Sequence, residues 1–545
     1  MKKAKLFIIT LLLVTIGCAQ PQPAENSIRM NSLGFLPEQR KEATLLSKVS
    51  TFEIKNASTN QSIFSGETTG PYFQEDVNQE VWMADFSSLT ETGEFYMELP
   101  NGEKSAVFAI NNRVYHDPFR VSMLGFYLWR CGTAVHAEHN GNVFSYAACH
   151  LEDGYDDYIG NAGHQRDGVG GWHDAGDYGK YTVNAGITLG MLFMAWDYFQ
   201  PAVKDISFIP NSESEMPDFL AELKWEMDWI LKMQYPDGSG RVSHKLTRTN
   251  FSGFIMPEFD DEKRFFTEWS SAATASFVAV TAKASQIFAD YDPSFSEKCL
   301  NAARLSYQYL KQHPEEKPFV QGDFQTGGYQ TNDADDKLWA AAEMWNATGE
   351  KAYLDDFERM TTQMNFVVEE NWDWGNVSNL GVFTYLLSNR EGKDETVEQK
   401  LIQNTIDIAN GIVSKSEKDV YRRPFERYYW GCNGTVARLT INLFVADKLQ
   451  PNKKYKNAAY DAVAHLFGRN YYNRSFVTGL GINPPMNPHD RRSGADDIAD
   501  PWPGYLVGGG HSATDWVDLE ESYSHNEIAI NWQGALVFAL AWVLQ

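Results

Sequence analysis

The sequence has little cysteine and a deficit of positive charge. Its 545 residues include 5 Cys, which excludes a small scaffold held together by disulfides. The 47 Lys and Arg residues are outnumbered by 72 Asp and Glu residues, giving a net charge of −25. Such a surface repels the phosphate backbone, so a nucleic-acid-binding function is excluded. After the first residues, no apolar stretch is long enough to span a bilayer.

The N-terminus has the pattern of a bacterial export signal. Three lysines precede an apolar run at residues 6–16, which is too short for a stable membrane span. Cys18 and a tether-like segment follow, which is typical of a lipoprotein signal, although Thr15 fits that signal imperfectly. We therefore expect a lipoprotein signal peptide at 1–18 and a tether at 19–26. The mature protein would lie at the cell surface or in the periplasm, with a lipid anchor as its only membrane contact; free secretion is the alternative.

Aromatic residues are abundant, with 16 Trp, 26 Tyr and 33 Phe. A large core explains them, and so does a cleft in which sugar rings stack on aromatic rings; composition does not choose between the two. The length allows two domains, one of them large.

The chain contains two regions with different sequence patterns. Residues 27–112 contain short alternating segments separated by turn residues, which predicts a small antiparallel β-sandwich. Residues 113–545 contain about twelve long segments with apolar residues at helical spacing, connected in places by long polar loops. The fold class is therefore mainly α, and helical hairpins arranged in a ring would gather the loops around a cleft.

Two aspartates stand close together in the segment GGWHDAGDYGKY, residues 170–181. Asp174 and Asp177 precede a helical segment, and two carboxylates in so short a loop can bind one water or one metal. Capping of the following helix is an equally good explanation from spacing alone.

A third acidic residue, Glu527, is predicted to open an apolar helix and could serve only the dipole of that helix. The nearby residues Trp516, Tyr523, His525 and Asn526 favour a site instead. A carboxyl group among apolar and aromatic side chains holds its proton near neutral pH. Glycosidic bonds are cleaved by such a pair of carboxyl groups, one acting as acid and the other as base or nucleophile.

The loop at 476–510 combines a Pro- and Gly-rich backbone with polar and aromatic side chains, including His489 and Arg491. A rigid structural loop explains this composition. Rigid polar loops are also what a site needs to orient sugar hydroxyls.

These motifs together resemble glycoside hydrolase family nine. The resemblance rests on the DAGD loop, on SFVTGLGINPPMNPHDRRS, on WGCNG at residues 430–434, and on the ending D-x4-Y-x2-NE. Residues 27–112 resemble the immunoglobulin-like module that precedes the catalytic domain in one branch of this family. The resemblance covers nearly the whole mature chain.

The resemblance implies an (α/α)6 barrel and inversion of configuration. Position by position it makes Asp177 the general base, Asp174 a residue that holds the attacking water, and Glu527 the general acid. It assigns sugar binding to His489, Arg491, Tyr523 and Trp430. The family often has a second His where this chain has Asp490, and immunoglobulin-bearing members share the form found here.

Four residues offer a metal site or a disulfide. Cys131 and Cys149 are neighbours in the sequence and could pair in an exported protein, the option that spacing favours. With His150 and His173 they also make a closed tetrahedral zinc set. The family resemblance favours the zinc, as a structural ion that pins the base loop.

The resemblance also implies a calcium site formed by Asp335, Asp336 and Asp373, whose hard oxygen ligands suit that ion. Capping explains the first two equally well. No cofactor is expected to take part in the chemistry.

The sequence thus predicts an inverting, endo-acting β-1,4-glucanase that works as a monomer on cellulose-like β-glucan. Alternatives within the same fold are hydrolysis of xyloglucan, mixed-linkage glucan or glucomannan, or exo-action on cello- or glucosamine oligosaccharides. A non-catalytic glycan-binding lipoprotein is a distant alternative, because it would not need Asp174, Asp177 and Glu527 together.

Overall fold

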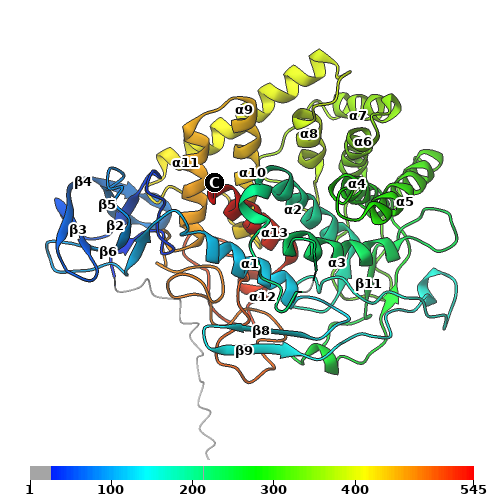
Figure 1. Ribbon diagram of the computed structural model, residues 1–545, viewed down its shortest axis with the longest axis horizontal. Helices are drawn as coiled ribbons and strands as arrows, with labels where there is room; N and C mark the ends of the chain where they lie inside the picture. The colour runs from blue at the N-terminus through cyan, green and yellow to red at the C-terminus, as the bar shows by residue number, and fades with distance from the viewer. Residues whose placement is uncertain (1–25, 213) are drawn as a thin grey trace, which may run out of the picture.

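The computed structural model describes residues 26–212 and 214–545, which form a β-sandwich beside a larger helical body (Figure 1). The predicted signal at 1–18 and nearly all of the predicted tether lie outside the described residues. Within the described part, none of the helices combines the length and the apolar character that crossing a membrane requires.

The sandwich is entirely antiparallel, with strand order β1-β2-β5-β4-β3-β6-β7. The long strand β4 pairs with β3 through its first half and with β5 through its second half, so it joins the two layers. Phenylalanine rings fill the space between the layers, where edge-to-face contacts add to the burial. The strands are β1 (Ile28–Arg29), β2 (Glu42–Leu45), β3 (Thr51–Asn56), β4 (Ser62–Gln74), β5 (Gln79–Asp85), β6 (Gly93–Glu98) and β7 (Phe108–Ile110).

Six helices form the inner ring of the helical body. Each contacts the next, and the last contacts the first, which closes the ring. Every residue of α13 is buried, and α2, α4 and α10 are nearly as enclosed, as expected for helices without a polar face. The inner helices are α2 (Thr182–Val203), α4 (Ser271–Ile287), α6 (Ala334–Thr348), α8 (Ser378–Leu387), α10 (Cys432–Leu449) and α13 (Ile530–Val543).

Six outer helices surround this ring. Five of them are amphipathic, with one face on the inner helices and one in solvent, whereas the first is buried along most of its length. They are α1 (His116–Leu128), α3 (Asp218–Met233), α5 (Pro293–Gln312), α7 (Lys351–Gln363), α9 (Glu395–Lys418) and α11 (Lys453–Leu466). Inner and outer helices alternate along the chain. The architecture is the expected (α/α)6 barrel preceded by a β-sandwich, so the predicted fold class is confirmed.

The loops that precede the inner helices carry short elements of their own. These are the hairpin β8 (Val135–His139) and β9 (Asn142–Tyr146), the small sheet of β10 (Lys180–Tyr181), β11 (Lys245–Thr247) and β12 (Phe265–Phe266), and the single turn α12 (Tyr523–Asn526). They were not predicted, because each is too short to show a period in the sequence.

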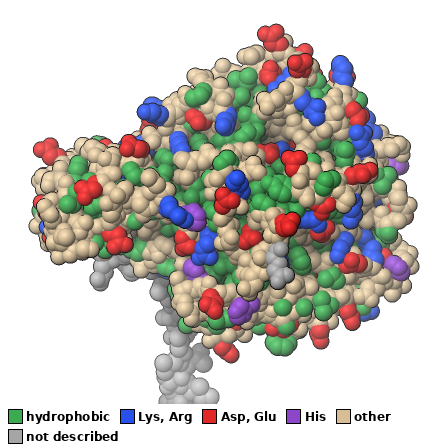
Figure 2. All heavy atoms as spheres, in the orientation of Figure 1, with side chains coloured by type: hydrophobic (Ala, Val, Ile, Leu, Met, Phe, Trp, Pro, Cys, Tyr) green, Lys and Arg blue, Asp and Glu red, His purple; other side chains and the backbone are tan. Residues whose placement is uncertain are grey.

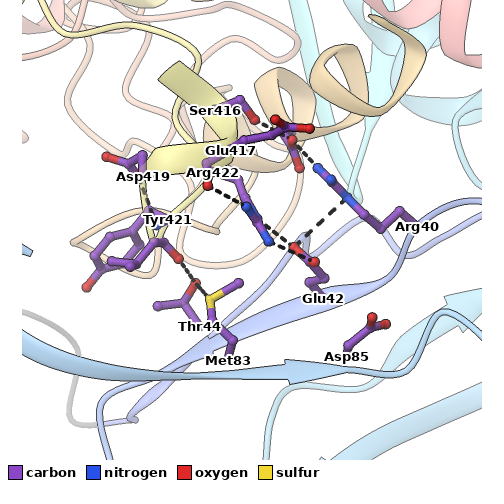
Figure 3. Close-up of polar contacts among 12 residues, drawn as sticks. Arg40, Glu42, Thr44, Met83, Asp85, Ser416, Glu417, Asp419, Tyr421 and Arg422 are labelled. Carbon is purple, nitrogen blue, oxygen red and sulfur yellow. Dashed lines mark hydrogen bonds and ion pairs between the residues drawn. The ribbon is translucent and has the colours of Figure 1, made fainter. Parts of the chain in front are cut away.

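A buried polar cluster joins the sandwich to the barrel (Figure 3). Glu42 of β2 accepts hydrogen bonds from Arg422 at 2.9 and 3.2 Å and from Arg469 at 3.2 Å. Burial raises the pKa of Glu42, but the positive charges of Arg469, Arg422 and Arg40 outweigh it and lower the pKa to about 2. Arg40 also pairs with Asp461 of α11. Ion pairs between buried charged side chains therefore connect the sandwich to the barrel.

Acidic and basic side chains are interspersed on the face shown in Figure 2, without a large basic patch. This mixture agrees with the exclusion of nucleic acid as a partner.

Candidate active site

Three distant segments meet at one end of the barrel through backbone pairing. Ala175, inside the turn at 174–177, forms an antiparallel bridge with Ala529, and His489 forms a parallel bridge with Glu527. The segment around Glu527 therefore lies between the turn of the two aspartates and the loop of the histidine. The predicted proximity of these segments is present in the structure.

Asp174 is almost fully buried and held at both carboxylate oxygens. The amide of Asn184 donates to one oxygen at 2.7 Å, and the hydroxyl of Tyr329 donates to the other at 2.6 Å. Burial, and then the charge of Asp177, raises the pKa of Asp174 to about 8. Asp174 is thus suited to sharing a proton at neutral pH rather than to carrying a full charge.

Asp177 is also buried, and one of its oxygens is held within the turn. It accepts a hydrogen bond from the backbone N–H of Gly179 at 2.9 Å and from the hydroxyl of Tyr181 at 3.3 Å. A small cavity lies beside it, lined in part by Arg248 and Phe251. Asp177 therefore borders a small cavity, and a proton acceptor for water needs access to such a space.

The surroundings of Glu527 favour its protonated form. Enclosure of its carboxyl group, followed by the negative charges of Asp177 and Asp174, raises its pKa well above the ordinary value. Arg491 and a hydrogen bond from Trp430 oppose this effect without cancelling it. Glu527 accordingly keeps its proton at a pH where an ordinary glutamate is ionised, as a general acid must.

Helix capping does not explain these carboxyl groups. The side chain at the N-cap of α2 is Tyr181, without a capping hydrogen bond, and α13 begins after Ala529. Glu527 is extended and lies between α12 and α13, which corrects the expectation that it opens the apolar helix. The capping alternatives for these three carboxyl groups are therefore wrong.

The predicted sugar-binding residues of the 476–510 loop border the same site. His489 is held by the backbone carbonyl of Glu520 at 2.7 Å, and Phe254 approaches its ring edge-on at 5.4 Å. The backbone N–H of Arg491 donates to Gly176 in the aspartate turn at 3.1 Å. The positions of His489 and Arg491 agree with sugar binding, and that role stays a prediction.

Two aromatic rings stand open beside Glu527. Trp430 is 46% exposed and Tyr523 is 52% exposed, and their rings meet edge-on with centroids 5.4 Å apart. Large exposed aromatic surface next to a carboxyl group is suited to stacking on a sugar ring.

Asp490 does not take the place of a sugar-binding histidine. Its carboxylate is buried and pairs with Arg492 at 3.0 Å, and Ser493 also donates to it at 3.0 Å. Arg492 in turn donates to the hydroxyl of Tyr505 at 3.0 Å. In this chain Asp490 therefore stabilises the 476–510 loop through buried contacts.

The four predicted zinc ligands come together. The ligand atoms of Cys131, Cys149, His150 and His173 lie within 4.8 Å of one another, and both cysteines are free thiols. Asp260 contacts the outer nitrogen of His150 at 3.3 Å, which orients the ring. Two thiols and two imidazoles fit a closed zinc site, and His173 precedes Asp174 directly, so an ion here would fix the base turn.

The three predicted calcium ligands are engaged differently. Asp335 accepts the backbone N–H of Val377 at 2.6 Å, whereas both carboxylate oxygens of buried Asp336 lack a hydrogen-bond partner. Asp373 is paired with Arg438 at 2.6 Å. Across residues 26–212 and 214–545, the cysteine–histidine group is the one set of three or more His, Cys, Asp or Glu residues whose side-chain atoms lie close enough together to hold a metal ion. The calcium site stays a prediction.

Sequence reasoning missed the residues that hold the aspartates. Tyr181 lies inside the same motif as Asp177, and that proximity is a signal from which it could have been found. Tyr329 lies far along the chain in a loop without a recognisable pattern, in a left-handed conformation with φ 43°. No signal in the sequence connects it with Asp174.

Comparison with known proteins agrees with this geometry. The model of "Glycosyl hydrolase family 9" matches residues 115–540, and that of "Cellulase N-terminal ig-like domain" matches residues 23–105. The chain is 53% identical to "Endoglucanase D" of Acetivibrio thermocellus over 521 residues, which cover 95% of this chain and 83% of the relative. It is 31% identical over 557 residues to "Xyloglucan-specific endo-beta-1,4-glucanase BoGH9A" of Bacteroides ovatus, covering 94% and 92% of the two chains.

Among solved structures, a metagenome-derived glycoside hydrolase family 9 endoglucanase superposes with a TM-score of 0.88 at 31% identity, covering 95% of this chain and 98% of the other. The family match spans the barrel and the relatives span almost the whole chain. The protein belongs to glycosyl hydrolase family 9 and is a glycoside hydrolase of the cellulase type.

Proposed function

We propose that the protein is an inverting endo-β-1,4-glucanase in which Asp177 is the general base and Glu527 the general acid. The observation that carries the proposal is the pairing of Ala175 with Ala529 and of His489 with Glu527, which brings the two carboxyl groups to one site. The surroundings of Glu527 support the role of an acid, because its raised pKa keeps its proton in place. The relatives named as endoglucanases support the substrate class.

In this mechanism Asp177 removes a proton from a water molecule that attacks the anomeric carbon. Glu527 gives its proton to the glycosidic oxygen on the opposite face of the sugar. Asp174, fixed by Asn184 and Tyr329, orients the water. Room for that water requires a carboxyl separation of about 6.5–9.5 Å, and one displacement at the anomeric carbon inverts its configuration.

Kinetics of two isosteric variants test the roles. Asp177→Asn and Glu527→Gln should each lower kcat on cellopentaose by about 10²–10⁴-fold. An aryl cellobioside with an acidic leaving group needs no proton donor, so it should recover activity with Glu527→Gln and not with Asp177→Asn. Glu521→Gln, which changes an exposed acid nearby, is the matched control. Wild-type turnover in either active-site variant would overturn the assignment.

The polymer is tested separately, because one relative is named xyloglucan-specific. For endo-action we expect the viscosity of a soluble β-1,4-glucan solution to fall rapidly while only a few reducing ends are released. Faster hydrolysis of xyloglucan than of unsubstituted glucan would favour the second substrate. Slow loss of viscosity with steady release of short sugars would indicate exo-action.

Several structural roles belong to the same proposal. Cys131, Cys149, His150 and His173 would hold a zinc ion that stiffens the base turn, and Asp335, Asp336 and Asp373 remain the proposed calcium ligands. Residues 27–112 would be the immunoglobulin-like module and residues 113–545 the catalytic domain of an exported, monomeric enzyme. Lipidation at Cys18 would anchor it to the membrane.

A further inference from the structure

Lys245 is a buried lysine close to the proposed base. Its side chain lies in β11, and its ammonium group donates to the side chain of Gln321 at 2.9 Å, to the hydroxyl of Thr326 at 3.0 Å and to the carbonyl of Gly327 at 2.8 Å. All three acceptors are neutral. Within the described residues Lys245 forms no ion pair, whereas the buried Lys283 pairs with Asp197.

The loop that Lys245 holds is connected to both aspartates. The N–H of Gly327 donates to the hydroxyl of Tyr181 at 3.0 Å, and that hydroxyl donates to Asp177 at 3.3 Å. Two residues further on, Tyr329 donates to Asp174 at 2.6 Å. Tyr181 and Lys245 are also paired across β10 and β11. One cation thus secures the loop that donates a hydrogen bond to Tyr181, the tyrosine at Asp177, and that supplies Tyr329, the tyrosine at Asp174.

We propose that Lys245 is a positioning residue of the reaction: its ammonium holds the 321–329 loop against the base and places a positive charge near Asp177. The inference rests on the proposed function, because it takes Asp177 as the base. Neighbouring carboxyl groups oppose one another's ionisation, and a nearby cation reduces this effect.

The charges around Lys245 support this role. Burial lowers the pKa of Lys245 to about 7, while the charge of Asp177 opposes this fall. The ammonium is therefore present below about pH 7 and is lost above it. Beside Asp177 the cavity is also lined by Arg248, Asp260 and Arg264, whose charges are paired: Arg248 with Asp260 and Glu262, and Arg264 with Asp153. The other titratable groups around Lys245 are the hydroxyl of Tyr181, whose pKa burial raises, and His244, whose pKa burial lowers to about 3. Neither carries a charge near neutral pH, and the rings of Phe319 and Phe324 line the remaining side.

The test compares neutral and charged substitutions at this position. Lys245→Gln keeps N–H donors and Lys245→Met keeps the length, and both remove the charge; Lys245→Arg retains it. In the neutral variants we expect the acidic limb of kcat/KM on cellopentaose to move up by about one pH unit. At a pH well below the limb, kcat/KM should therefore fall about 10-fold, through kcat rather than through KM. Lys245→Arg should restore the position of the limb.

Lys283→Met is the matched control, because it removes a buried lysine near the C-terminal end of α4, away from Asp174 and Asp177. It should lower the melting temperature and leave the limb in place. A limb that stays at its wild-type pH in folded Lys245→Gln would overturn the inference, even if activity or stability falls. If both neutral variants fail to fold, Tyr181→Phe removes only the linking hydroxyl; an upward shift would support the inference, and an unmoved limb would overturn it.

Failure of the proposed function gives a different result. Activity of the Asp177→Asn variant would reject the assignment of Asp177 as the base, and with it the proposed function. An inactive Asp177→Asn variant together with an unmoved limb in Lys245→Gln rejects only the role of the lysine.

Discussion

Ala175 and Ala529 are bridge partners, although one lies near the start of the barrel sequence and the other near its end. The bridge joins the turn of the proposed base directly to the strand of the proposed acid. The separation of the two carboxyl groups is therefore set by backbone hydrogen bonds rather than by flexible side chains. Such rigid support is what catalysis by positioned groups requires.

Removing the hydroxyl of Tyr329 should impair turnover more than binding. The hydroxyl contacts Asp174, and loss of one buried hydrogen bond costs about 1 kcal/mol, or about fivefold in rate. We expect Tyr329→Phe to lower kcat about fivefold or more with little change in KM for cellopentaose. Tyr291→Phe, which alters a hydroxyl bonded to Gln200 on α2, is the control and should behave as wild type. An unchanged kcat in Tyr329→Phe would show that the contact is dispensable.

Substitutions of Trp430 should separate stacking from hydrogen bonding. The exposed ring is proposed to contact sugar, and an aromatic contact contributes about 0.5–1.5 kcal/mol, so Trp430→Ala should raise KM by about 2–12-fold. The hydrogen bond from Trp430 lowers the pKa of Glu527. Trp430→Phe should therefore keep KM near wild type and move the alkaline limb of kcat/KM to higher pH. Equal KM values in wild type and Trp430→Ala would contradict stacking at this position.

Zinc retention should depend on Asp260. Its carboxylate contacts the outer nitrogen of His150 and directs the other nitrogen towards Cys131, 3.6 Å from the thiol sulfur. Loss of such a supporting group weakens metal binding about 10–100-fold, so Asp260→Asn should lose zinc at lower chelator concentration. Asp261→Asn, at the exposed neighbouring position, should retain it. Elemental analysis that finds no zinc in the wild-type protein would remove the basis of the prediction.

Glu42 should make stability depend on pH. Its pKa is lowered to about 2 from an ordinary value of 4.5, so its contribution is complete above about pH 4.5 and is lost as the pH falls towards 2. The linkage amounts to about 3 kcal/mol. Glu42→Gln should lower the melting temperature at pH 7, and the difference from wild type should shrink between pH 5 and pH 3.

Glu53→Gln is the control for this measurement, because Glu53 forms a surface pair with Lys55 on β3. Such exposed pairs contribute little. A difference between Glu42→Gln and wild type that stays constant from pH 7 to pH 3 would contradict the linkage.

Much of the architecture could be predicted, because apolar periodicity and turn residues are local properties. The outer helices have apolar periods, the inner helices are recognisable as long apolar segments, and the motif around Asp177 points to chemistry before any fold is known. The conformation of Glu527 was misjudged for a local reason as well. An acidic residue at the start of an apolar segment has the pattern of a helix start, whereas Glu527 is held extended by its pairing with His489 and by a hydrogen bond from Gly508 to its carbonyl.

The rest depends on contacts that no local pattern records. The approach of Tyr329 to Asp174 and the bonds of Lys245 to the 321–329 loop arise when loops from different helical hairpins meet. The pairing of Asp373 with Arg438 joins two such hairpins too, so the sequence could not show that this carboxylate already has a cationic partner.

The configuration of the first product tests the central claim most directly. Proton NMR during the first turnovers of cellopentaose resolves the two anomers before mutarotation mixes them. Attack by a water held at Asp177, with Glu527 on the other face, predicts that the new reducing end appears as the α-anomer. A β-anomer formed first would contradict the account.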